Sequence, residues 1–134
     1  MSTLKAANIQ STTTGAPTFK TSTGTEIGQL AKAWVTFGGT GTVAIIEDFN
    51  VTSVTDEDQG AYTVNLTNAM GNANYAVATC LQYDSNQTAT TAGSAQQLEL
   101  ARVSRTTSSF GLICCIYTGT LYDAESIFAV VFGP

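Results

Sequence analysis

The sequence contains no histidine in its 134 residues. This absence removes the usual general base at neutral pH, the catalytic triads built on His and the commonest metal ligand. Asp56, Glu57 and Asp58 fall in one short segment that we expect to be a solvated turn, so they cannot flank a sugar by themselves. Pairing with a distant carboxylate, or a calcium ion on this turn, stays open. The sequence predicts no enzyme, no cofactor and no catalytic or metal site.

Charged residues are also scarce. Only 11% of the residues are charged and 43% are hydrophobic, whereas about 25% charged is usual for a soluble domain. This balance predicts that part of the surface is covered by a partner, as in an obligate oligomer; the alternative is a neutral, Thr-rich monomer. With five Lys and Arg and a net charge of −5, the chain has no basic surface for nucleic acid or anionic membranes.

Long apolar runs are missing as well. No stretch of about 18 apolar residues exists, so no transmembrane helix and no membrane insertion are expected. The opening Met1-Ser-Thr-Leu-Lys lacks the apolar centre of a signal peptide. We therefore expect synthesis in a cytoplasm without export by the general secretory route.

The three cysteines, Cys80, Cys114 and Cys115, have no CxxC spacing and match no zinc site. Adjacent residues of a strand face opposite ways. We therefore expect one of Cys114 and Cys115 in the core and the other against a neighbouring element or subunit.

The first 31 residues differ in composition from the rest. Ser, Thr, Gly and Ala dominate them, with isolated apolar residues that cannot build a core. We interpret residues 1–31 as an arm that packs on sister chains or anchors in a larger particle, and residues 32–134 as the folded domain. The only weak helix candidate of the chain is Glu26–Lys32, where the arm meets the folded domain.

From Lys32 the pattern is one of short strands separated by turns. Tyr62, Val64 and Leu66 alternate with polar neighbours, as in a half-buried strand. We expect eight strands, at 32–37, 42–46, 49–54, 61–67, 74–83, 96–104, 110–117 and 126–132. This spacing predicts an all-β fold, an antiparallel, jelly-roll-like β-sandwich.

Part of this strand-rich region carries a specific motif pattern. In order, the motif residues are Ala33-Trp34-Val35, Phe37, Gly39-Thr40-Gly41-Thr42, Phe49-Asn50-Val51, Gly60, Tyr62-Thr63-Val64-Asn65, Ala69-Met70 and Ala73-Asn74-Tyr75. The pattern resembles a block of bacteriophage tail-fibre and related virion fibre proteins, including cyanophage-like ones. Thr36 and Gly71 depart from it, where Asn and Pro are more usual. The resemblance covers about residues 1–80 and carries no catalytic residue.

The resemblance implies a virion location and a β-sandwich homotrimer in a tail fibre, fibre or spike that attaches to the host cell surface. The arm would bind other phage tail, baseplate or capsid proteins. The alternative is a capsid decoration, head-fibre or baseplate protein without receptor binding.

Two polar loops are the candidate receptor sites, 84–95 and 118–123, since loops carry recognition in such proteins. Tyr beside Asp or Asn suits carbohydrate, so host surface polysaccharide is the expected receptor class. Plain surface loops are the alternative. The candidate receptor residues are Tyr83, Asp84, Asn86, Leu121, Tyr122 and Asp123. For the oligomer interface, the candidates are Trp34, Phe37 and Cys115; Trp34, the sole tryptophan, could also be core or stack on a sugar.

Overall fold

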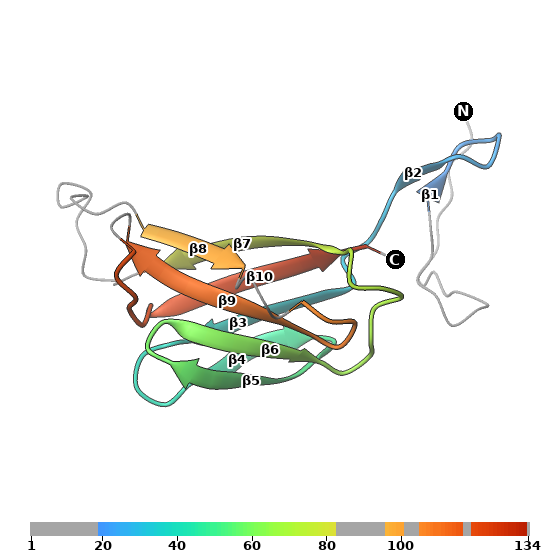
Figure 1. The fold of residues 1–134 in the computed structure, drawn as a ribbon. Coiled ribbons are helices and arrows are strands. Elements are labelled where there is room, and N and C mark those ends of the chain that lie inside the picture. Colours follow the sequence, from blue (N-terminus) through green and yellow to red (C-terminus); the bar gives the residue numbers. More distant parts are fainter. Residues whose placement is uncertain (1–18, 83–95, 101–104, 117–118, 134) are drawn as a thin grey trace. The chain divides into compact units, whose positions relative to one another are not determined.

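The computed structural model describes residues 19–82, 96–100, 105–116 and 119–133 (Figure 1). The chain divides into two compact units, Met1–Leu30 and Ala31–Pro134. The boundary lies one residue before the expected one.

The described part of the first unit is a short β-ribbon. Strand β1 (Phe19–Lys20) pairs antiparallel with β2 (Glu26–Gly28). The Thr21 hydroxyl accepts a bond from the Thr25 amide at 3.1 Å and holds the turn between them. The weak helix expectation is therefore wrong, because Glu26–Gly28 bonds to a neighbouring strand. Phe19 and Ile27 are exposed within this unit.

The second unit is a sandwich of two four-stranded antiparallel sheets, which confirms the expected fold class. The first sheet has the order β4-β3-β10-β7 and the second the order β5-β6-β9-β8. The strands are β3 (Ala33–Gly38), β4 (Ala44–Phe49), β5 (Val51–Asp58), β6 (Ala61–Leu66), β7 (Ala76–Gln82), β8 (Gln96–Leu100), β9 (Ser109–Ile116) and β10 (Ser126–Phe132).

The end of strand β5 differs from the expectation. Strand β5 continues to Asp58, and the turn to β6 is only Gln59-Gly60. The acidic residues Asp56, Glu57 and Asp58 are therefore strand residues at the exposed edge of the second sheet, and not a turn.

The chain passes from the first sheet to the second at a single residue, Asn50, between β4 and β5. Its φ of 58° lies in the left-handed region, which Asn tolerates better than most residues. The Asn50 amide donates to the Lys32 carbonyl at 2.9 Å, and its carbonyl oxygen accepts from the Asn68 backbone amide at 2.7 Å. Asn50 thus links the corner between β4 and β5 by hydrogen bonds to Lys32 and to Asn68.

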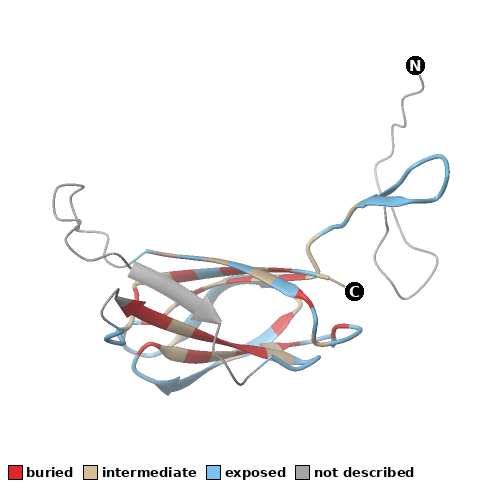
Figure 2. Cartoon of the chain, turned by 45° about the horizontal axis from the view of Figure 1, so that its top comes forward, coloured by how far each residue is buried: buried red, intermediate tan, exposed pale blue. Residues whose placement is uncertain are grey.

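The core lies between the two sheets and is built from alternate residues of their strands (Figure 2). Its largest fully buried side chains include Tyr62, Tyr75, Phe37 and Phe110. The rings of Phe37 and Tyr62 meet edge to face at 5.2 Å between centroids, which joins the first sheet to the second. Cys114 and Cys115 are both buried, whereas Cys80 is exposed.

Candidate functional site

The strand registers bring the candidate receptor segments to one end of the sandwich. Ser126 pairs with Gln82, so the start of β10 lies beside the end of β7. Gln96, at the start of β8, pairs with Ile116 at the end of β9. Residues 119–125 and the strand ends that lead into residues 83–95 therefore share this end, which we call the loop end.

The chain enters the sandwich at the opposite end. Ala33 pairs with Val131 near the end of β10, and the Lys32 amide donates to the Val131 carbonyl at 2.8 Å. The sandwich therefore has a polarity, because the chain enters β3 at one end and residues 119–125 lie at the other.

A partly buried polar cluster organises the loop end. Asp123 Oδ1 accepts a bond from the Gly60 backbone amide at 2.8 Å and another from the Tyr62 hydroxyl at 2.9 Å. The Tyr62 hydroxyl also lies 3.3 Å from the Gly39 carbonyl, and the Gly39 amide donates to the Ala124 carbonyl. The Asp123 carboxylate thus fixes residues 119–125 against the β5–β6 turn, and the bond from Gly39 to Ala124 ties them to the β3–β4 loop.

Burial also suppresses ionisation in this cluster. Desolvation, followed by the hydrogen bond to Asp123, raises the pKa of Tyr62 far above its usual value of 10.0. Burial, with smaller effects of Asp123 and Cys115, raises the pKa of the Cys114 thiol from 9.0 to about 12. Both groups stay protonated in the folded chain at pH values where the unfolded chain loses the proton.

We expect the protein to lose stability in alkali, and Tyr62→Phe to weaken that dependence. Because the folded-state pKa values are raised, this stability is fully present below about pH 9 and declines as pH rises, by about 1.4 kcal/mol per pH unit for each group. Urea unfolding at pH 8, 10 and 11 measures it.

At pH 8, Tyr62→Phe should cost about 1–2 kcal/mol, because Asp123 loses a buried donor. Between pH 10 and 11 its free energy of unfolding should fall by about 1 kcal/mol less than that of the wild type, because the Tyr62 hydroxyl of the unfolded wild type ionises across this range. Equal slopes for the two proteins would contradict a buried, protonated Tyr62.

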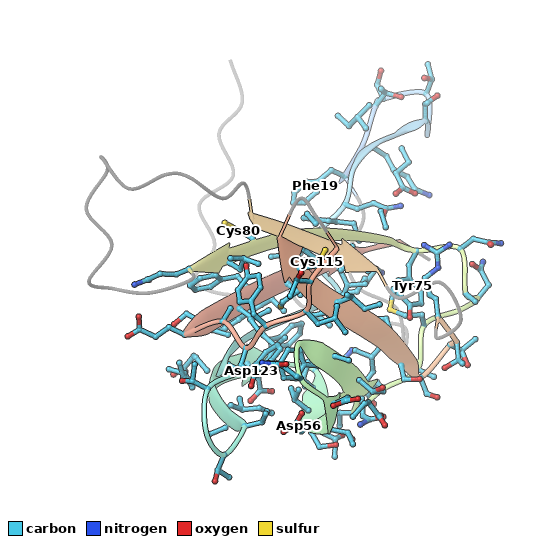
Figure 3. The ribbon with its side chains drawn as sticks, turned by 60° about the vertical axis from the view of Figure 1, so that its left-hand side comes forward. Phe19, Asp56, Tyr75, Cys80, Cys115 and Asp123 are labelled. Carbon is cyan, nitrogen blue, oxygen red and sulfur yellow. The ribbon has the colours of Figure 1, made fainter. Side chains whose placement is uncertain are left out.

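The candidate receptor residues divide into two groups. Tyr83, Asp84 and Asn86 lie outside the described residues. Of the others, Leu121 is 37% exposed, whereas Tyr122 and Asp123 are half-buried. The Asp123 carboxylate, labelled in Figure 3, binds the chain's own Gly60 and Tyr62. Leu121 is therefore the described residue of this set best placed to meet a receptor.

The candidate interface residues also divide. Phe37 is fully buried and offers a partner chain no surface, since it points between the two sheets against Tyr62. Cys115 is buried as well, and its backbone forms an isolated bridge with Leu121. Trp34 lies on the outward side of β3 and is half-exposed, because its neighbours Ala33 and Val35 are the ones that enter the core.

Among residues 19–82, 96–100, 105–116 and 119–133, no group of three or more His, Cys, Asp or Glu side chains is placed to hold a metal ion. The same residues include no helix long and apolar enough to cross a membrane.

Comparison with known proteins adds no relative. No protein-family model matches the chain, and neither a curated protein nor a solved structure is significantly similar to it.

Sequence reasoning missed the residues that organise the loop end. Alternation predicts only that Tyr62 enters the core, and Gly60 appears only as one residue of the motif pattern. The one available signal was a Gly just before an apolar strand, which fits a tight hairpin but does not identify Asp123 as its partner 63 residues away.

Proposed function

We propose that this chain is a structural protein of a bacteriophage virion, a tail-fibre, fibre or spike component whose homotrimer attaches to the host cell surface. The observation that supports it best is the polarity of the sandwich. The chain enters the sandwich at one end, at Ala33, while residues 119–125 and the strand ends leading into 83–95 meet at the other. An adhesive fibre needs its receptor-binding residues at an end of the domain that the entering chain leaves free.

The motif pattern supports the virion setting of this proposal. Its residues fall at structurally demanding places in the fold, such as the Asn50 corner and the Gly60 turn, both with positive φ. A resemblance at such positions concerns the fold rather than an active site, which suits a structural role.

The expected receptor is host surface polysaccharide, engaged by loops. Each contact would be weak, but three loop ends on one fibre raise the avidity by roughly 10²–10⁴ without new contacts. Leu121 is exposed and follows Gly119 and the polar residue Thr120. Its side chain would supply an apolar contact for a sugar ring.

One observation favours the alternative, a capsid decoration, head-fibre or baseplate protein that binds no receptor. Tyr122 and Asp123 are half-buried, and the Asp123 carboxylate is engaged inside the chain. In such a protein, Tyr122 and Asp123 would stabilise the loop end and would not contact a receptor.

Two measurements test the proposal. Immunogold labelling of purified phage particles should place the chain in the virion, and its absence from particles would contradict both structural roles. The labelled full chain should then bind cells within a panel of bacterial strains, in competition with their purified surface polysaccharide. Binding to no strain would favour the decoration role.

We expect Leu121→Asp to weaken cell binding at least about tenfold, since losing an apolar contact worth about 1.5 kcal/mol at each site corresponds to that factor. Thr40→Asp, an exposed residue on the neighbouring β3–β4 loop, is the matched control for added charge. An equal loss for both variants would point to charge repulsion at the cell surface instead.

A further inference from the structure

The two sheets differ in the side chains that they turn away from the core. On the second sheet, Ala61 and Ile113 lie on the outer face toward the end of β9, whereas hydroxyl and amide side chains gather on the same face toward the start of β9. Asn65 pairs there with Ser53, and its amide donates to the Ser53 and Thr55 hydroxyls at 3.1 and 3.2 Å. Thr63 and Ser109 belong to the same face. The polar groups of such a face form hydrogen bonds with one another and with water.

The outer face of the first sheet is apolar. The registers place Phe49, Trp34, Val130 and Ala78 in one row across all four strands. The next row across the sheet holds Glu47, Thr36, Phe128 and Cys80. Toward the end of β10, Phe132 pairs with Ala76. We call this surface the apolar face.

Large side chains on the apolar face are open to solvent in the single chain. Phe49 is 53% exposed and Phe128 is 36% exposed. Each neighbours other apolar side chains of the face, so they form a continuous patch rather than scattered residues. Contiguous exposed patches of this kind mark interaction sites, and an aromatic cluster around a central Trp is typical of interface hot spots.

We propose that further copies of this chain pack on the apolar face of the β4-β3-β10-β7 sheet. The choice of a like chain as partner rests on the proposed homo-oligomeric fibre, and the specific surface rests on the observations above. Of the three interface candidates from the sequence, Trp34 lies on this surface, whereas Phe37 and Cys115 do not.

The distribution of charge favours a like partner. Among the residues that these four strands turn outward, as far as the structure describes them, Glu47 on edge strand β4 is the only charged one; Lys32, which precedes β3, lies at the margin of the face beside the end of β10. Asp56, Glu57 and Asp58 lie on β5 of the other sheet. Copies of a chain with a net charge of −5 can therefore meet through this face while their acidic strands stay apart.

The size of the face fits a modest but specific contact. Four strands about 4.8 Å apart and seven residues of about 3.3 Å give a plane of roughly 440 Å². A stable pair buries about 800 Å² on each partner, so the plane supplies about half. Ile46, exposed at the β-bulge of β4, and Phe132 extend the apolar area at its margins.

The solution mass of the full chain, measured by light scattering at several concentrations, tests this proposal. The wild type should remain near three times 14.0 kDa. Phe128→Lys should shift the mass toward one chain, because a lysine would be buried among apolar groups without a partner charge. Ala78→Lys, in the neighbouring row, is a second variant should the first not fold. Thr55→Lys, exposed on the polar outer face, should leave the mass unchanged.

Two reporters on the apolar face distinguish a sister chain from the chain's own N-terminal unit. Cys80 pairs with Phe128 and is exposed in the single chain (Figure 3). Its labelling by a bulky maleimide should rise by roughly tenfold or more in Phe128→Lys, since thiol reactivity follows exposure. Emission from Trp34, the only tryptophan, should move to longer wavelength together with it.

A wild-type monomer would overturn the proposal. A monomer in which Cys80 is nonetheless protected would identify the chain's own N-terminal unit as the cover. A mass that falls with Thr55→Lys but not with Phe128→Lys would place the interface on the other sheet. A wild-type monomer would also remove the homotrimer from the proposed function, whereas presence in particles and binding to cells are tested separately, so a role in the virion can stand when this interface fails.

Discussion

Gly60→Ala, in the β5–β6 turn, is expected to destabilise the protein strongly, whereas Gly41→Ala, in the β3–β4 loop, should have a mild effect. Gly60 has a φ of 67° and Gly41 a φ of 69°, so both changes carry the same conformational cost. They differ in space, because a Cβ at Gly60 would lie 2.7 Å from the Cys114 and Tyr122 carbonyl oxygens, whereas nothing lies within 4 Å at Gly41.

The three nearest atoms at Gly60 all belong to backbone, so no side chain can rotate away. We expect Gly60→Ala to cost about 3–5 kcal/mol, which combines about 1–2 kcal/mol for the left-handed conformation with an overpacking cost of similar or larger size. Gly41→Ala should cost only about 1–2 kcal/mol.

Urea unfolding at pH 7 of the two variants and the wild type measures this difference. Gly60→Ala removes a large part of the roughly 5–15 kcal/mol that stabilises a typical domain, and its melting temperature should fall by about 10 °C or more. Similar losses for both variants would show that backbone conformation, and not the close approach of the β5–β6 turn to residues 114 and 122, sets the cost.

Asn50→Ala should give the second large effect. The substitution removes the amide bonds to the Lys32 and Asn68 carbonyls and the acceptor of the Asn68 backbone and side-chain amides. It also places alanine at a φ of 58°. We expect a loss of at least about 3 kcal/mol, because each of the four bonds contributes about 0.5 kcal/mol or more and the backbone strain adds about 1 kcal/mol.

Asn50→Gly separates the two contributions, since glycine accepts the left-handed conformation but makes no side-chain bond. It should therefore be less destabilising than Asn50→Ala by about 1 kcal/mol in the same unfolding assay. If glycine costs as much as alanine, the corner depends on the hydrogen bonds alone.

Alternation of apolar and polar residues was sufficient to identify most strands. Tyr62, Val64 and Leu66 enter the core as predicted, because strand side chains alternate with a period of two. The same rule misjudged the end of β5, where three acidic residues look like a turn. The β5 edge position exposes both sides of that strand, so its side chains need not alternate in polarity.

The expectation for Asn50 shows a different limit. Its motif Phe49-Asn50-Val51 looks like continuous strand, yet the chain changes sheets there. A left-handed residue inside an apolar run leaves little local signal when it is Asn rather than Gly, because Asn also occurs in strands and loops.

The candidate site was harder to predict, because its contacts join residues that are far apart along the chain. Loop positions followed from composition, but the engagement of Asp123 by Gly60 and Tyr62 joins residues more than 60 positions apart. Nor does sequence distinguish the outer side of a strand from the inner one when both are apolar, as Trp34 and Phe37 show on β3.

The sequence by itself determined the all-β class, the approximate strands and the lack of catalytic histidine, because each of these depends on composition or on short-range periodicity. Only the tertiary structure decided which end of the sandwich carries the loops, which sheet is apolar on its outer face and which carboxylate closes the loop end. Those properties depend on strand order and register, and these are set by packing between segments that are distant along the chain.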